Sequence, residues 1–244
     1  MPEKSLGRLF LICTPIGNLE DMSFRAIRVL KELDALGCED TRVSKRLLQH
    51  YEIPTPGILF SYHEHNELRA NSKILELLGQ GLQVGLVTDA GNPSISDPGF
   101  RATQAAGEAG FTIEVIPGPS AVNTALLLSG LPSSSFTFKG FPPKKDGQRT
   151  RFLEPEANLP HSLIFFESKY RVVSFLKSAE KILGNRQAAV CVELTKKFER
   201  VYRGYLSELV NRLKDKNIKG EVTIVIAGNH PKFMEQRPDK SEEE

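Results

Sequence analysis

Short apolar runs alternate with amphipathic stretches along the whole chain, which is typical of an α/β protein with mainly parallel sheets. In the first half, the apolar runs predict strands at 9–14, 35–38, 58–62, 84–88 and 112–116. The stretches between them carry apolar residues at helical spacing and predict helices at 24–33, 44–50, 67–78 and 98–109. We expect Asp97 to cap the last of these helices, with Pro98 at its first helical position.

A Pro-Gly-Pro segment at 117–119 interrupts this alternation and predicts a domain boundary. The expected units are an N-terminal α/β domain at 1–117, a C-terminal α/β domain at 118–230 and a charged, disordered tail at 231–244. In the second domain the pattern predicts strands at 136–141, 162–167, 188–194, 199–203 and 221–227, and helices at 121–129, 171–183 and 205–214. The third and fourth of these strands are too close for a helical crossover, so this sheet should have mixed strand directions.

Composition excludes several classes of protein. No apolar run approaches the ~20 residues that cross a bilayer, and the first residues lack the order of a signal peptide, so we expect a cytoplasmic protein. The three cysteines lie in apolar runs without paired spacing, which predicts buried side chains and no metal site. His63 and His65 stand two residues apart and cannot share a helix face, so we assign them no metal either.

Three unusual loops follow predicted strands, at 14–21, 89–99 and 117–121. Ligands of open α/β sheets bind beyond the carboxyl ends of the strands, so we expect these loops to converge on a ligand. The chain has neither a P-loop nor a G-x-G-x-x-G segment after its first strand, which argues against a pyrophosphate-bearing ligand. S-adenosylmethionine is compatible with glycine backbone contacts, apolar walls and a few polar groups.

Five motifs carry a more specific resemblance: Thr14-Pro-Ile-Gly-Asn-Leu-Glu-Asp21, Glu39-Asp-Thr-Arg42, Asp89-Ala-Gly-Asn-Pro-Ser-Ile-Ser-Asp-Pro-Gly99, Pro117-Gly-Pro-Ser-Ala121 and Glu193-Leu-Thr-Lys196. In this order they resemble the tetrapyrrole methylase superfamily, and within it the branch that methylates a ribose 2'-oxygen in small-subunit ribosomal RNA. Superfamily members that act on tetrapyrroles usually have Gly-Asp-Pro where this chain has Gly91-Asn92-Pro93. The asparagine is typical of the ribosomal branch and argues against a porphyrin substrate.

The resemblance implies a two-domain homodimer that holds S-adenosylmethionine in the cleft between its domains and methylates a decoding-centre cytidine of the small ribosomal subunit. The cofactor contacts it implies are Pro15, Asp89, Ala90, Gly91, Asn92, Ile95, Ser120, Ala121, Phe166, Glu167 and Leu194.

Methylation of a ribose hydroxyl calls for a general base, or for a cation that stabilises the developing alkoxide. The charged residues at strand ends make Asp40 or Glu39 the candidate base and Lys196 the candidate cation. For RNA docking, a flexible basic loop beside Phe138 and Phe141 combines phosphate contacts with base stacking. The candidate RNA-binding residues are Arg42, Lys139, Lys144, Lys145, Arg149 and Arg151.

Plainer interpretations stay open at this point. The 117–120 segment is equally well a linker, and the basic residues between 139 and 151 equally well a solvated surface loop. Glu39, Asp40 and Arg42 can form a helix cap and an ion pair, and Lys196 can simply face water. A tetrapyrrole or other small-molecule methyltransferase and a non-catalytic RNA-binding module are the alternative functions.

Overall fold

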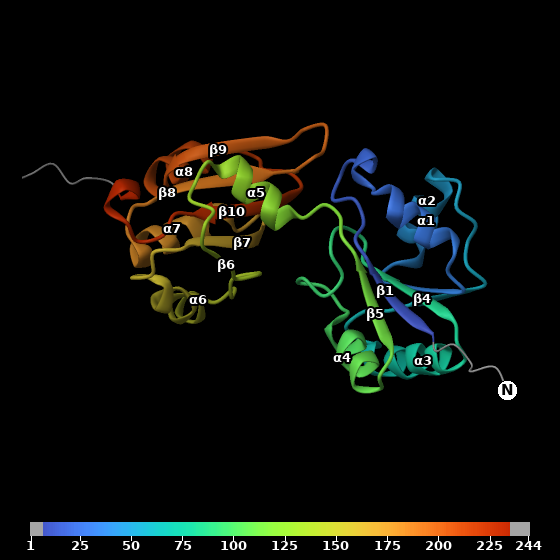
Figure 1. Cartoon of the computed structure of the whole chain (residues 1–244). Helices are drawn as coiled ribbons and strands as arrows, with labels where there is room; N and C mark the ends of the chain where they lie inside the picture. Colours follow the sequence, from blue (N-terminus) through green and yellow to red (C-terminus); the bar gives the residue numbers. More distant parts are fainter. Residues whose placement is uncertain (1–6, 235–244) are drawn as a thin grey trace, which may run out of the picture. The chain divides into compact units, whose positions relative to one another are not determined.

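The computed structural model describes residues 7–234. The chain divides between Ser120 and Ala121 into two compact units (Figure 1), so the Pro-Gly-Pro segment belongs to the first of them. Of the predicted tail at 231–244, the structure describes a short 3-10 helix, Pro231–Phe233, and Met234 after it; the rest lies outside the described residues. No helix of the described part is long and apolar enough to cross a membrane.

The first unit is built on a five-stranded sheet in the order β3-β2-β4-β1-β5. Every neighbouring pair in it is parallel, as the alternation of strands and helices predicts. The strands are β1 (Arg8–Ile12), β2 (Ala35–Cys38), β3 (Ile58–Ser61), β4 (Gln83–Val87) and β5 (Thr112–Ile116).

Helices cover both faces of this sheet (Figure 1). Successive strand residues point to opposite faces, so Phe10 and Ile12 pack with α1 and α2, while Leu9 and Leu11 pack with α3 and α4. The helices are α1 (Phe24–Lys31), α2 (Thr41–His50), α3 (Glu67–Gly79) and α4 (Phe100–Glu108), and a 3-10 turn, Leu19–Asp21, precedes α1. Helix α2 begins three residues before its predicted start, because Asp40 caps it by accepting the Arg42 N–H at 2.8 Å.

The second unit has a mixed sheet in the order β6-β7-β10-β8-β9. Only β6 and β7 are parallel among the neighbouring strands that the structure describes; the other pairs are antiparallel, which confirms the predicted mixture of directions. The strands are β6 (Phe136–Phe138), β7 (Ser162–Ser168), β8 (Gln187–Val192), β9 (Arg200–Tyr205) and β10 (Glu221–Ile226).

One face of the second sheet carries the largest apolar core, in which Phe165 of β7 lies 4.9 Å from Phe175 of α7, centroid to centroid. On the opposite face, the Cys191 thiol approaches the Ala125 carbonyl of α5 at 4.0 Å. The helices are α5 (Ala121–Ser129), α6 (Asp146–Leu153), α7 (Val172–Leu183) and α8 (Leu206–Leu213), with a 3-10 turn, Glu154–Glu156, after α6.

Arg186 is the largest fully buried side chain of the described residues. Its guanidinium donates to three backbone carbonyls: Leu183 at 2.7 Å, Ala227 at 3.4 Å, and Ala157. A buried cation is expensive unless its donors are satisfied, so Arg186 ties the end of α7 to the end of β10 and to the turn after α6.

Candidate active site

Three loops meet at the carboxyl edge of the first sheet. The Thr14 N–H, after β1, donates to the Gly91 carbonyl, after β4, at 2.9 Å, and the Gly91 N–H donates back to the Thr14 carbonyl at 3.1 Å. The side-chain amide of Asn92 reaches the Pro119 carbonyl, after β5, at 3.4 Å. The predicted convergence is confirmed, and it follows because β4, β1 and β5 are neighbours in a parallel sheet.

Asn92 joins these loops with both ends of its amide. Its Oδ1 accepts a hydrogen bond from the Cys13 thiol at 2.7 Å, and its Nδ2 donates to the Pro119 carbonyl. Burial raises the pKa of the Cys13 thiol, which therefore stays protonated as a donor. An aspartate could accept from the thiol but would place a second acceptor against Pro119, so the geometry gives a physical reason for asparagine here.

The loop between Gly91 and Gly99 holds its backbone in unusual conformations. The φ angles are 84° at Gly91, 73° at Ser94, 64° at Ser96 and 143° at Gly99. A left-handed conformation costs a non-glycine residue about 1–3 kcal/mol and is concentrated at functional sites. The Ser94 hydroxyl is also buried without a hydrogen-bond partner among residues 7–234, so this loop is built for something besides its own stability.

The predicted start of α4 is wrong. The helix begins at Phe100 with Gly99 as its N-cap, and Pro98 lies outside it. The Pro98 carbonyl instead accepts the Ser94 N–H at 3.2 Å, which closes a turn before the helix. A Cβ at Gly99 would lie 2.5 Å from the Ser94 hydroxyl, so only glycine fits at this close approach.

Acidic side chains cross-link the ends of β2 and β4. The Glu39 carboxylate accepts from the Thr88 hydroxyl at 2.9 Å and from the Asp89 N–H at 3.3 Å. The Asp89 carboxylate accepts from the Asp40 N–H at 3.0 Å. Burial raises the pKa of Asp89, and its acidic neighbours Glu39 and Asp40 add to that shift.

Asp40 takes the plainer of its two predicted roles, that of a cap with an ion pair. Besides capping α2, it holds the Arg42 guanidinium with a bidentate pair of contacts, Nε to Oδ1 at 3.0 Å and Nη2 to Oδ2 at 2.6 Å. Hydrogen bonding from Arg42 lowers the pKa of Asp40 to about 2. A general base works best with a pKa near the operating pH, so this geometry disfavours Asp40 as the base.

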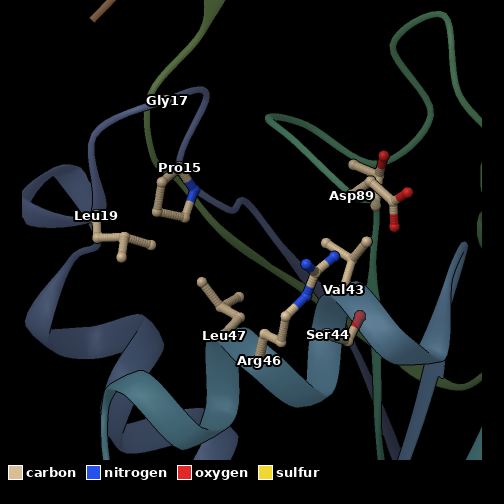
Figure 2. Close-up of a pocket in the computed structure, with 9 residues that line it drawn as sticks. Pro15, Gly17, Leu19, Val43, Ser44, Arg46, Leu47 and Asp89 are labelled. Atoms are coloured by element: carbon tan, nitrogen blue, oxygen red, sulfur yellow. The ribbon is translucent and has the colours of Figure 1, made fainter. Parts of the chain in front are cut away.

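A pocket of about 230 Å³ opens beside these loops, between the turn after β1 and helix α2 (Figure 2). Its lining comes from the turn after β1, from α2 and from Thr88 and Asp89, which follow β4. The Tyr51 hydroxyl donates to the Leu19 carbonyl and so fastens the turn to the end of α2. The lining residues are Pro15, Gly17, Leu19, Val43, Ser44, Arg46, Leu47, Thr88 and Asp89.

The predicted Lys196 lies in a strained turn after β8 of the second unit. Glu193 and Thr195 have φ angles of 54° and 63°. The Lys196 ammonium lies 2.9 Å from Glu193 Oε1 and 2.9 Å from Glu221 Oε2. Burial opposes the charge of Lys196, but the two carboxylates outweigh it and raise the pKa, so Lys196 is a fixed cation. Leu194 is buried between the two left-handed residues.

Phe166 and Glu167 point to opposite faces of the second sheet, as neighbours in a strand must. Phe166 packs against Phe138 at 4.8 Å between ring centroids. The Glu167 side chain is fully buried on the helical side, with its Oε1 2.6 Å from Arg171 and its Oε2 without a partner among the described residues. A ligand on the Phe166 face can therefore meet Glu167 only through its backbone.

The expected basic loop at 139–151 is shorter than predicted: residues 139–145 form no helix or strand, whereas residues 146–153 form α6. Arg149 is buried, bonded to Asp146 and to the Ser178 hydroxyl at 3.0 Å. The Lys139 ammonium lies 2.7 Å from Glu156 Oε1 and over the Phe152 ring. Lys139 and Arg149, both predicted to contact RNA, therefore bind other side chains of the protein. Lys144, Lys145 and Arg151 remain exposed.

Sequence reasoning missed Cys13 and the cations of α2, Lys45 and Arg46. The Cys13 contact joins residues 79 positions apart and follows from strand register, which no local pattern reveals. The spacing of Arg42, Lys45 and Arg46 could have revealed a row of cations on α2, because residues three and four apart lie on one face of a helix. Within residues 7–234, no group of three or more His, Cys, Asp or Glu side chains is placed to hold a metal ion.

A family model described as tetrapyrrole (corrin/porphyrin) methylases matches residues 8–210. The chain belongs to the tetrapyrrole methylase family. This makes it similar to S-adenosylmethionine-dependent methylases over most of its length, and the resemblance carried by the five motifs is confirmed.

Within the tetrapyrrole methylase family, the chain is similar to proteins named as ribosomal RNA methyltransferases. The chain is 46% identical over 226 residues to "Ribosomal RNA small subunit methyltransferase I" of Halalkalibacterium halodurans, covering 93% of this chain and 78% of the relative. It is 41% identical over 234 residues to the protein of the same name from Bacillus subtilis, covering 96% and 80% of the two chains.

Solved structures share the fold at low identity. Uroporphyrin-III-C-methyltransferase from Thermus thermophilus matches with a TM-score of 0.65 and 18% identity, covering 91% of this chain and 94% of that one. Diphthine synthase matches with a TM-score of 0.68 and 12% identity, covering 91% and 90%. These likenesses confirm the α/β fold class of this methylase and say nothing of its substrate.

Proposed function

We propose that this protein transfers a methyl group from S-adenosylmethionine to the ribose 2'-oxygen of a decoding-centre cytidine in small-subunit ribosomal RNA. The observation that carries the proposal is the 46% identity over 93% of the chain to a relative named as a ribosomal RNA small subunit methyltransferase. Asn92 supports it, because its amide bonds both Cys13 and Pro119 where an aspartate could satisfy only one of them.

The first-unit loops suit S-adenosylmethionine. The backbone is left-handed at Gly91, Ser94 and Ser96, and the buried Ser94 hydroxyl has no partner among the described residues. The proposal assigns the methyl donor to Pro15, to the loop from Asp89 through Ala90 to Ile95, and to Ser120, with Ala121, Phe166 and Leu194 as its contacts from the second unit.

Methyl transfer to a hydroxyl needs in-line approach and removal of the hydroxyl proton. Because the pKa of Asp40 is about 2, the proposal moves the base from Asp40 to the neighbouring pair Glu39 and Asp89. Asp89 is the stronger candidate, since its carboxylate lines the pocket beside α2 and desolvation raises its pKa. Lys196 is the proposed cation for the developing alkoxide, held in place by Glu193 and Glu221.

The proposed partner is the ribosomal RNA of the small subunit, met in the cytoplasm, with the protein acting as a homodimer. Sedimentation of the purified protein tests the dimer. Exposed Lys144, Lys145, Arg151 and Arg42 remain proposed phosphate contacts, of which Arg42 is the weakest because Asp40 already neutralises it.

The deciding experiment supplies labelled S-adenosylmethionine and purified protein to small ribosomal subunits from cells that lack this methylation. We expect the label on a decoding-centre cytidine, and alkaline hydrolysis to skip the bond that follows it, since a methylated 2'-oxygen cannot attack. Uroporphyrinogen serves as the competing substrate. Label on the tetrapyrrole, or none on the RNA despite calorimetric binding of S-adenosylmethionine, would reject the proposal.

A further inference from the structure

The pocket between the turn after β1 and α2 is too small for a whole cofactor. Its volume of about 230 Å³ falls below the roughly 300–1,000 Å³ of pockets that enclose complete drug-sized ligands. Its walls are mostly apolar, from Pro15, Leu19, Val43 and Leu47. Such walls suit one flat ring system.

One cation lines this pocket, and a second lies next to it on α2. Arg46 is one of the lining residues and rises from α2 beside Val43 and Leu47 (Figure 2). Lys45 precedes it and, like Arg46, is exposed. Neither has an ion-pair partner in the part of the chain that the structure describes, whereas Arg42 on the same helix face is held by Asp40.

The other side of the pocket belongs to the methyl-donor loops. Pro15 and Asp89 line the pocket and are also residues that the proposed function assigns to S-adenosylmethionine and to the base. A ring placed in the pocket therefore has its attached sugar near the carboxylates at the ends of β2 and β4. Catalysis by positioning requires this kind of adjacency between the two reactants.

We propose that this pocket receives the base of the target nucleotide, turned out of its stack, and that Lys45 and Arg46 bind the phosphates on either side of it. The inference rests on the proposed function and names the substrate site for that reaction. Apolar walls accept a nucleobase face, the unpaired cations Arg46 and Lys45 complement phosphates, and enzymes that modify one nucleotide commonly evert it into a pocket.

The first test removes these two charges with the double variant Lys45→Gln, Arg46→Gln. Each lost phosphate contact lowers the slope of log affinity against log salt by about 0.7–0.9, so two contacts weaken small-subunit binding on the order of 20-fold at 0.15 M salt. The matched control is Arg69→Gln, an exposed arginine on α3, across the sheet from α2, which should keep the wild-type slope. A double variant with the wild-type slope would overturn the inference.

The second test fills the pocket with Val43→Trp, whose fold is checked by circular dichroism. We expect methylation of small subunits to fall at least tenfold while calorimetric affinity for S-adenosylmethionine stays within about twofold. Weakened S-adenosylmethionine binding would assign the pocket to the methyl donor, and unchanged methylation would leave it without a role; either result overturns the inference while wild-type activity upholds the proposed function. Wild-type protein that fails to methylate small subunits would overturn both.

Discussion

Replacement of Asn92 by aspartate tests whether this side chain joins the three loops as the structure shows. The variant keeps the acceptor for the Cys13 thiol but loses the N–H that reaches the Pro119 carbonyl at 3.4 Å. A part-buried carbonyl left without its donor costs about 1–3 kcal/mol, and the new negative charge faces its oxygen. For a unit of this size, about 2 kcal/mol corresponds to a fall in Tm of roughly 6–10 °C.

The sign of the pH dependence sharpens this prediction. The carboxyl group of Asn92→Asp faces a carbonyl oxygen, so its folded-state pKa is raised above the ordinary value of about 3.9. Protonation at low pH gives the group an O–H that can donate to Pro119. The loss of Tm relative to wild type should therefore be full at pH 8 and shrink as the pH falls through the raised pKa.

Differential scanning calorimetry of wild type, Asn92→Asp and Asn92→Ala at pH 4.5, 6 and 8 measures this. Asn92→Ala removes both hydrogen bonds without adding a charge, so its Tm deficit should not depend on pH. A Tm for Asn92→Asp within 1 °C of wild type at pH 8, or a deficit that is equal at all three pH values, would refute the proposed reason for asparagine.

Three further predictions concern the second unit. Lys196→Met should lower methylation about 100-fold and leave S-adenosylmethionine affinity nearly intact. Because the variant loses the ion pairs of Lys196 with Glu193 and Glu221, its Tm should lie below that of wild type from about pH 5 to pH 9. This Tm deficit should vanish as the pH rises through the raised pKa of Lys196 or falls through the lowered pKa of Glu193. Gly220→Ala, whose Cβ would lie 1.9 Å from Glu193 Oε1 at a φ of 83°, should displace Glu193 and reduce methylation in a labelled-cofactor assay; full activity would contradict the role of Glu193 in holding Lys196. Arg186→Met should destabilise the unit by about 3 kcal/mol in urea unfolding because it leaves three buried carbonyls without donors, whereas exposed Arg151→Met should change stability by less than about 0.5 kcal/mol.

The hydrophobic pattern predicted most of the helices and strands, because the positions that are buried in each element are apolar in the sequence. Parallel strands covered on both faces appear as continuous apolar runs, and helices on those faces appear with one apolar side. Helix α6 escaped prediction because it combines Gly147 with charged residues and buries little more than Arg149 and Leu153. The start of α4 was mispredicted because Asp97-Pro98 has the composition of a helix start while Gly99 turns the backbone away from one.

The candidate site, like the fold, could be predicted only in part. Convergence of the loops could be predicted, since it depends only on strand order and on where strands end. The hydrogen bond between Asn92 and Cys13 and the ion pair between Asp40 and Arg42 could not be distinguished from other pairings in the sequence, because they depend on side-chain geometry. Lys139 and Arg149 show this most clearly, since a basic segment reads the same whether its cations face water or neutralise carboxylates such as Glu156.

Two serines of the loop after β4 have a left-handed backbone conformation, and this has a consequence for protein engineering. Ser94 and Ser96 adopt φ angles that asparagine and glycine tolerate better. A library selected for heat tolerance alone should therefore enrich Asn or Gly at the exposed Ser96, where the hydroxyl has least to contact. At Ser94 the same selection would discard the buried hydroxyl, so heat-tolerant variants that lose Ser94 should be the ones that lose affinity for the methyl donor.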